Sequence, residues 1–127
     1  MGFTHKILWM SDLHQTVSGQ VEGVNSRTRL RQVIDQMNRY HPDAACCVVS
    51  GDLTDTGTPE EYAALTDRLA SLNTPLLPMI GNHDNRENLL AALPYSGSGL
   101  ESYYQYRFDL DENVSLLCLD TALPGSD

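Results

Sequence analysis

Three short apolar segments alternate with two segments of helical periodicity in the first two-thirds of this 127-residue chain. The apolar segments span residues 5–10, 44–50 and 75–80, and their length and composition are typical of buried strands. In the two intervening segments, apolar residues recur at every third or fourth position, which indicates helices with one buried face. Strand, helix, strand, helix, strand is the order that builds a parallel sheet with crossover helices. We therefore expect an α/β fold.

Local signals predict where the helices begin and end. Asn25 or Ser26 can cap the first helix, and a proline at position 42 prevents its continuation. Thr58 and Glu61 have the spacing of a capping box with proline at the first helical position, and the buried stripe of this second helix extends to residue 72. A third, shorter helix is expected at about residues 86–92.

The last part of the chain is expected to form a β-hairpin. Residues 103–108 and 114–119 have strand character and flank a turn at 109–113. Helices normally cover both faces of a parallel sheet, yet only three are predicted and none follows the hairpin. We therefore interpret residues 1–127 as the N-terminal portion of a single domain, apparently truncated, unless a partner supplies the missing cover.

Composition limits the class of protein and its partners. Seventeen acidic residues against eight Lys and Arg give a net charge of −9, which works against sequence-independent nucleic-acid binding. Apolar runs are too short for a signal peptide or a membrane span, and the three cysteines show no Cys-x-x-Cys zinc pattern, so we expect a cytoplasmic protein with buried thiols. The basic residues of the first helix are interpreted as a solvated face: Arg27, Arg29, Arg31 and Arg39.

Polar residues follow each of the three predicted parallel strands. Because the carboxyl ends of parallel strands meet at one edge of a sheet, these groups are expected to converge. Asp12 and His14 are two residues apart in a nearly extended segment, which would put both side chains on the same side. Gly51 and Gly81 would allow tight turns where the strands end. The complete set is Asp12, His14, Asp52, Asn82, His83 and Asp84.

Carboxylate, imidazole and amide groups suit manganese, iron or zinc better than calcium or a structural zinc site. Each group alone is weak evidence, since an isolated Gly-Asp or Asn-His-Asp is more often a turn or a helix cap. Three such groups in order after three apolar strands favour a metal site. Two aspartates, one asparagine and one or two histidines cannot saturate two metal ions, so further ligands must come from elsewhere.

The sequence resembles the calcineurin-like metallophosphoesterases, whose hallmarks are Asp-x-His, Gly-Asp and Gly-Asn-His-Asp. The resemblance covers residues 5 to about 120 and is greatest to bacterial class III cyclic nucleotide phosphodiesterases and glycerophosphodiesterases, through residues 49–55, 59–62 and 78–84. It implies two metal ions: Asp12 and His14 would bind the first, Asp52 would bridge both, and Asn82 would bind the second. It further implies that His83 faces the substrate and that Asp84 orients His83.

The implied activity is hydrolysis of a small phosphodiester by a hydroxide that bridges the metal ions. The later family motifs, a further histidine and a Gly-His-x-His pair, have no match here. His5 and His41 precede strands and are expected at the wrong end of the sheet, in surface or capping roles, whereas Arg86 can reach a phosphate or lie on a helix surface. The alternatives are an inactive fragment or incomplete subunit that binds metal weakly, completed by a C-terminal half or a second copy, and a metal-free scaffold.

Overall fold

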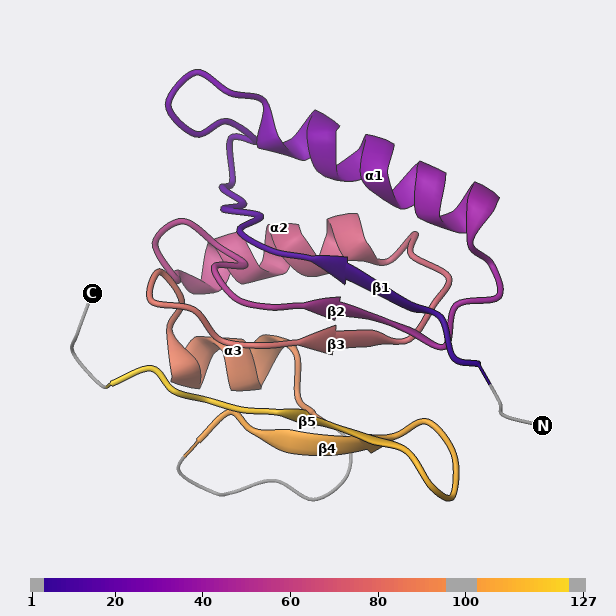
Figure 1. Ribbon diagram of the computed structural model, residues 1–127. Helices are drawn as coiled ribbons and strands as arrows, with labels where there is room; N and C mark the ends of the chain where they lie inside the picture. The colour runs from indigo at the N-terminus through magenta and orange to yellow at the C-terminus, as the bar shows by residue number, and fades with distance from the viewer. Residues whose placement is uncertain (1–3, 96–102, 124–127) are drawn as a thin grey trace.

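The computed structural model describes residues 4–95 and 103–123, and it has the predicted α/β order. A parallel sheet contains β1 (Ile7–Met10), β2 (Cys46–Val49) and β3 (Leu76–Pro78) in the order β1-β2-β3. The crossover helices are α1 (Ser26–Tyr40) and α2 (Pro59–Leu69), and α3 (Arg86–Ala92) follows β3. An antiparallel hairpin of β4 (Tyr106–Asp109) and β5 (Ser115–Cys118) comes last (Figure 1).

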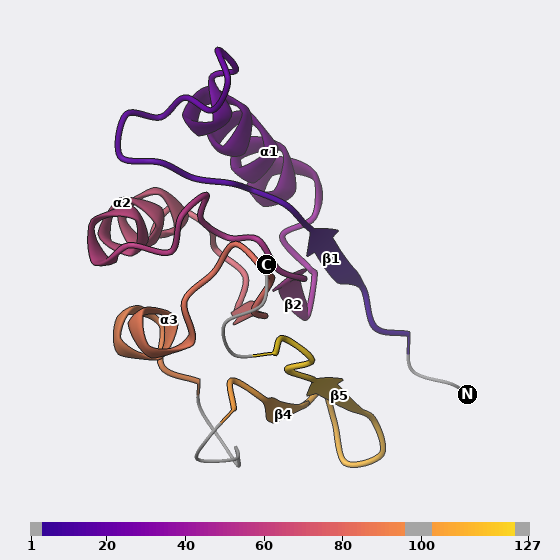
Figure 2. The same cartoon turned by 90° about the vertical axis from the view of Figure 1, so that its left-hand side faces the viewer.

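The three described helices lie on one face of the sheet, so no helix among the described residues covers the other face, in agreement with the missing cover that we inferred from the sequence. Because the strand order follows the chain order, both right-handed crossovers pass over the same face. Figure 2 shows α1, α2 and α3 on one side of the strands. The hairpin lies beyond β3 (Figure 1), and the hydroxyl group of Tyr106 donates to the carbonyl oxygen of Pro78 at 2.7 Å.

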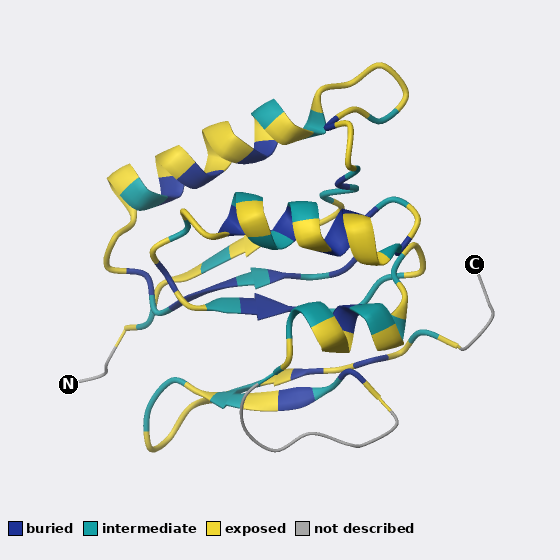
Figure 3. Ribbon diagram, turned by 180° about the vertical axis from the view of Figure 1, so that it is seen from behind, coloured by how far each residue is buried: buried dark blue, intermediate teal, exposed yellow. Residues whose placement is uncertain are grey.

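The main core fills the space between the helices and the sheet. The buried sides of α1 and α2 face the strands, and their outer sides are exposed (Figure 3). Cys47 points toward α1, where its sulfur lies 3.9 Å from that of Met37. Cys46 points the other way, because successive strand residues alternate, and it lies near Cys118 of the hairpin. All three cysteines are free and buried, as predicted.

The predicted helix starts are confirmed, with one change at α2. The side chain of Asn25 accepts from the N–H of Thr28, and that of Thr58 accepts from the N–H of Glu61. The capping box is only half formed, because the Glu61 carboxylate reaches back to the N–H and hydroxyl group of Thr56 instead of the N–H of Thr58. The helix also ends at Leu69, three residues before the predicted end.

Part of the sheet face opposite the helices is open. Trp9 of β1 is 73% exposed, and β1 pairs with β2 alone among the described strands. Within the described residues, every helix is too short or too polar to span a bilayer. The edge strand β1 therefore leaves apolar side chains exposed, among them Ile7 and Trp9.

Candidate metal centre

The loops that follow β1 and β2 run side by side and carry three of the predicted metal ligands. The backbone N–H of Asp12 donates to the carbonyl oxygen of Gly51 at 3.0 Å, and that of His14 donates to Asp52 at 2.9 Å. The β3 end approaches equally closely, because a Cβ on Gly81 would lie 2.2 Å from the backbone nitrogen of Asp52. Glycine at position 81 allows this close approach, and a larger residue there would displace Asp52.

The side chains of Asp12, His14 and Asp52 converge on one point. His14 Nε2 lies 3.6 Å from Asp12 Oδ1 and 3.7 Å from Asp52 Oδ2, and one ligand atom from each residue lies within 4.8 Å of the others. The predicted extended conformation of this segment is wrong, since Asp12 and His14 have φ angles of 58° and 43°. These two residues with left-handed backbone conformation turn the chain, and the turn brings their side chains together.

Asn82 lies against the same carboxylate. In the orientation that satisfies its hydrogen bonds, the amide nitrogen of Asn82 is 3.2 Å from both carboxylate oxygens of Asp52. Rotation of the amide by half a turn would present its oxygen to a cation beside Asp52. The backbone N–H of His83 also donates to Asp52 Oδ1 at 3.0 Å. All four predicted metal ligands therefore lie at one edge of the sheet, and their binding of metal stays a prediction.

Asp55 joins the site, although we predicted no role for it. Its backbone carbonyl oxygen lies 2.7 Å from His83 Nδ1, and its carboxylate lies 3.4 Å from His14 Nδ1. The two histidine rings meet edge to face, with 4.8 Å between their centroids. The Asp55 carbonyl, helped by the carboxylates of Asp52, Asp55 and Asp84, raises the pKa of His83. The available signal was an acidic residue three positions after the Gly-Asp pair.

Asp84 has a different place from the one we expected. Its carboxylate accepts from the N–H groups of Leu53, Thr54 and Gly81, and from the hydroxyl groups of Thr54 and Tyr62, at 2.9–3.1 Å. None of the hydrogen bonds among the described residues joins this carboxylate to the imidazole of His83. Asp84 therefore holds the loops after β2 and β3 together, and the hydrogen-bond partner of the His83 imidazole is the carbonyl oxygen of Asp55.

Arg86 neither lies free on the helix surface nor points into the site. Its guanidinium group binds the carboxylate of Asp120 through two hydrogen bonds, at 2.6 and 2.8 Å, and also donates to the carbonyl oxygen of Ala122. Asp120 is buried just after β5 and accepts a further bond from the N–H of Tyr104. This pair fixes the start of α3, two residues after Asp84, to the end of the hairpin.

The remaining two histidines lie at the opposite end of the sheet, as predicted. His5 Nε2 lies 2.6 Å from the Asp111 carboxylate in the hairpin turn. His41 caps the end of α1, where its N–H donates to the carbonyl oxygen of Met37. Neither residue reaches the metal centre, so the described part of the chain supplies no further histidine to it.

The donor groups at the centre fit metal binding. Their separations of 3.6–3.7 Å are long for hydrogen bonds but suit ligands of one shared ion, whose bonds are about 2.0–2.2 Å. The cluster combines carboxylate and imidazole donors, which manganese, iron and zinc accept. The Ser11 hydroxyl group, more than any other neighbour, lowers the pKa of Asp12 and keeps that carboxylate ionised. A divalent cation would offset the negative charge gathered there.

The geometry agrees with the comparison with known families. Residues 5–122 match the family model of the calcineurin-like phosphoesterases. Since this match covers most of the chain, the chain belongs to that family, which confirms the resemblance seen in the sequence motifs.

Named relatives are phosphodiesterases. A probable cyclic nucleotide phosphodiesterase of Rhodopseudomonas palustris is 33% identical over 124 residues, and the match covers 94% of this chain and 45% of that protein. The glycerophosphodiester phosphodiesterase GpdQ of Enterobacter lignolyticus is 39% identical over 99 residues, which cover 73% of this chain and 34% of that protein. The chain thus spans less than half the length of these relatives.

A solved structure supports the fold alone. Yellow lupin purple acid phosphatase PPD1 superposes with a TM-score of 0.58 over 83% of this chain and 22% of the plant chain, at 16% identity. The parallel strands, the helices and the hairpin therefore share the fold of part of that plant chain.

Proposed function

We propose that this chain contributes the N-terminal, metal-binding part of a phosphodiesterase that hydrolyses small phosphodiesters of the cyclic nucleotide or glycerophosphodiester type. The observation that carries the proposal is the convergence of Asp12, His14, Asp52 and Asn82 at one sheet edge, with the ring of His83 beside them. The named relatives support the phosphodiester class of substrate. Two metal ions, of manganese, iron or zinc, are part of the proposal.

Each ligand has a place in this scheme. Asp12 and His14 would hold one ion, Asn82 a second, and Asp52 lies between the two groups and would bind both. When bound, the ions supply Lewis acidity and lower the pKa of water at the site, so that water can attack phosphorus near neutral pH. The chain's contribution is to fix the ligands through the paired loops after β1 and β2.

His83 would act on the substrate. The Asp55 carbonyl oxygen can only accept, so the nearby Nδ1 of His83 carries a proton and Nε2 is left for the substrate. The raised pKa of His83 favours the protonated imidazole, which can stabilise a phosphoryl oxygen or give its proton to the leaving alkoxide. Asp55 would orient the ring, and Asp84 would maintain the loops around it.

The test is hydrolysis of a chromogenic phosphodiester by the purified chain, with manganese added and a chelator as control. Asp52→Asn is expected to lose bound metal and turnover together. His83→Gln should keep its metal, measured by mass spectrometry, and lose about 10²–10⁴-fold in rate. His41→Gln, at the opposite end of the sheet, is the matched control. Full activity in Asp52→Asn or in His83→Gln would refute the roles assigned to them.

A second candidate is an incomplete subunit that binds metal but does not turn over. The length comparison favours it, because the chain covers 45% of the first relative named above. A folded chain that binds manganese through Asp52 yet hydrolyses nothing would establish this alternative. Supplying the C-terminal half of a relative in trans would then be expected to restore turnover.

A further inference from the structure

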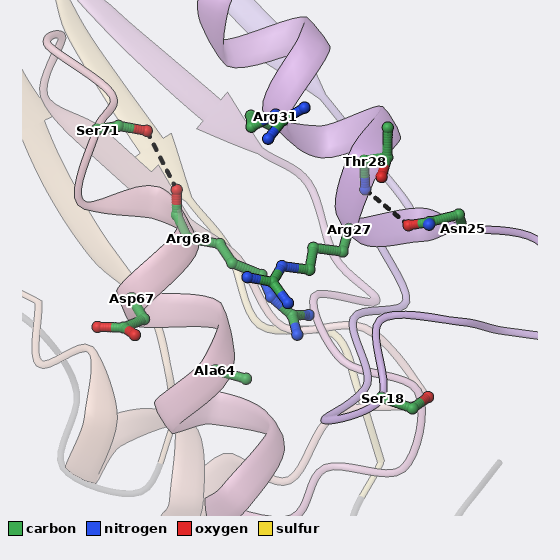
Figure 4. A pocket seen from close by; sticks show the side chains of 9 residues that line it. All are labelled: Ser18, Asn25, Arg27, Thr28, Arg31, Ala64, Asp67, Arg68 and Ser71. Carbon is green, nitrogen blue, oxygen red and sulfur yellow. Dashed lines mark hydrogen bonds between the residues drawn. The ribbon is translucent and has the colours of Figure 1, made fainter.

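A cleft between α1 and α2 concentrates positive charge on an acidic chain. Its volume is about 630 Å³, and Arg27 and Arg31 of α1 face Arg68 of α2 across it (Figure 4). These are three of the eight basic residues in a chain whose net charge is −9. The four first-helix arginines are exposed, as predicted, and two of them also line this cleft with a third arginine from another helix.

The charge in this cleft is largely unpaired. Arg27 and Arg31 make no side-chain hydrogen bond or ion pair with any residue in the described ranges 4–95 and 103–123. Arg68 donates only to neutral oxygen atoms, those of the Gln15 side chain and of the Thr16 and Val17 backbone. Asp67 is the single carboxylate among the lining residues, so three guanidinium groups face one acid.

The two central cations repel each other. Figure 4 shows the side chains of Arg27 and Arg68 extending toward one another from their two helices. Burial lowers the pKa of Arg68, and the charge of Arg27 lowers it further. Like charges held together at a partly buried site are stabilised when an anion lies between them. Phosphate suits this arrangement, since guanidinium groups bind its oxygens through paired hydrogen bonds.

Side chains, not the helix end, would hold such an anion. The first four backbone N–H groups of α1 already donate to oxygen atoms of residues 19, 24 and 25. Hydroxyl groups of Ser18 and Thr28 line the same cleft and can add hydrogen bonds. The lining residues include none of the predicted metal ligands, so the cleft is separate from the metal centre.

We propose that this cleft binds the phosphate group of a small anion, either free phosphate or a phosphate monoester. The cleft is also linked to the metal centre through Arg68, which holds residues 15–17 directly after His14. An anion that binds the Arg68 guanidinium would therefore compete with these hydrogen bonds and affect the loop that carries His14. The site itself requires no catalytic activity, and it stands independently of the proposed phosphodiesterase function.

The test is calorimetric titration of the chelator-treated chain with inorganic phosphate, ribose 5-phosphate and ribose. Saturable binding of one phosphate or one ribose 5-phosphate per chain is expected, and no binding of ribose. If the two phosphates bind equally, the phosphate group alone is recognised; if ribose 5-phosphate binds much more tightly, the ligand is a monoester. Failure of both to bind, or equal binding of ribose, would overturn the proposal.

Variants locate the site. The double variant Arg27→Gln, Arg31→Gln should weaken phosphate binding at least tenfold, because both charges are exposed and their removal leaves the fold intact. Arg39→Gln is the matched control, since it removes a charge from the same helix outside the cleft. Asp52→Asn should bind phosphate as well as the unaltered chain. An equal loss in Arg39→Gln would indicate a general charge effect, and a loss in Asp52→Asn would place the anion at the metal centre; either result contradicts the proposal.

Discussion

The residues at the metal centre have backbone conformations that most side chains avoid. Asp12, His14 and Asp52 have φ angles between 43° and 58°, in the left-handed region, where non-glycine residues are uncommon. Such conformations cost of order 1–3 kcal/mol each and cluster at functional sites. The sequence identified these residues because each follows an apolar strand. It did not predict their conformation, which depends on pairing between the loops after β1 and β2.

Asp84 and Asp55 should have separable roles, one in folding and one in the site. Asp84→Asn places an amide N–H₂ among five donors, so we expect the free energy of unfolding to fall by about 2–4 kcal/mol. Asp55→Asn should change it by no more than about 0.5 kcal/mol, because Asp55 is partly exposed and its carbonyl group remains. Urea denaturation of both variants measures the difference. Equal stability in the two would contradict the role given to Asp84.

Local sequence signals predict the individual helices and strands more closely than they predict how these elements are arranged. Helix starts at Asn25, Thr58 and Asn85 are capped by side chains, and such caps can be recognised from residue type and spacing. The placement of the crossover helices α1 and α2 on one sheet face depends on strand order, which no local signal encodes. The partner of Arg86 was equally hidden, because Asp120 is 34 positions away in sequence.

The Arg86 and Asp120 pair should stabilise the contact between α3 and the hairpin. Burial alone would raise the pKa of Asp120, but the Arg86 guanidinium and two backbone N–H groups outweigh it and lower that pKa below 3.8. A carboxyl group with a lowered folded-state pKa contributes stability above its unfolded pKa, and that contribution disappears as pH falls through the folded value. We therefore expect this contribution to be present at pH 7 and to decline below about pH 4.

Asp120→Asn tests this contribution. At pH 7 the variant should lose about 2–3 kcal/mol of unfolding free energy, because it leaves the partly buried Arg86 without its charged partner. The difference from the unaltered chain should shrink as the pH falls below about 4. Asp109→Asn, which removes an exposed partner of Arg107, is the control and should be nearly neutral. A loss for Asp120→Asn that did not depend on pH would show that packing, not charge, is responsible.

For the whole molecule, the open sheet face is the main difference from a fully covered α/β domain. Ile7 and Trp9 of β1 are exposed apolar residues, and the chain covers less than half the length of the relatives named above. Exposed apolar patches and unpaired strand edges favour association with another polypeptide. This face is consistent with either completion by further chain or contact with a second copy.

Trp9 can report on that face because it is the only tryptophan in the chain. Because Trp9 is 73% exposed, its fluorescence in dilute solution should resemble that of a water-exposed indole, and acrylamide should quench it efficiently. A tryptophan amide in the same buffer is the reference. Strong protection from quenching at high dilution would contradict the exposed position of Trp9, whereas protection that appears only at high concentration would indicate self-association.

The three buried thiols can report which part of the folded protein opens to solvent first. Burial raises the pKa values of Cys46, Cys47 and Cys118, that of Cys47 to about 11, so the folded protein presents almost no thiolate to an alkylating reagent at neutral pH. Cys46 and Cys118 lie between the sheet and the hairpin, whereas Cys47 lies beneath α1. Mass spectrometry of which cysteine is labelled first would therefore distinguish detachment of the hairpin from exposure of the helical layer.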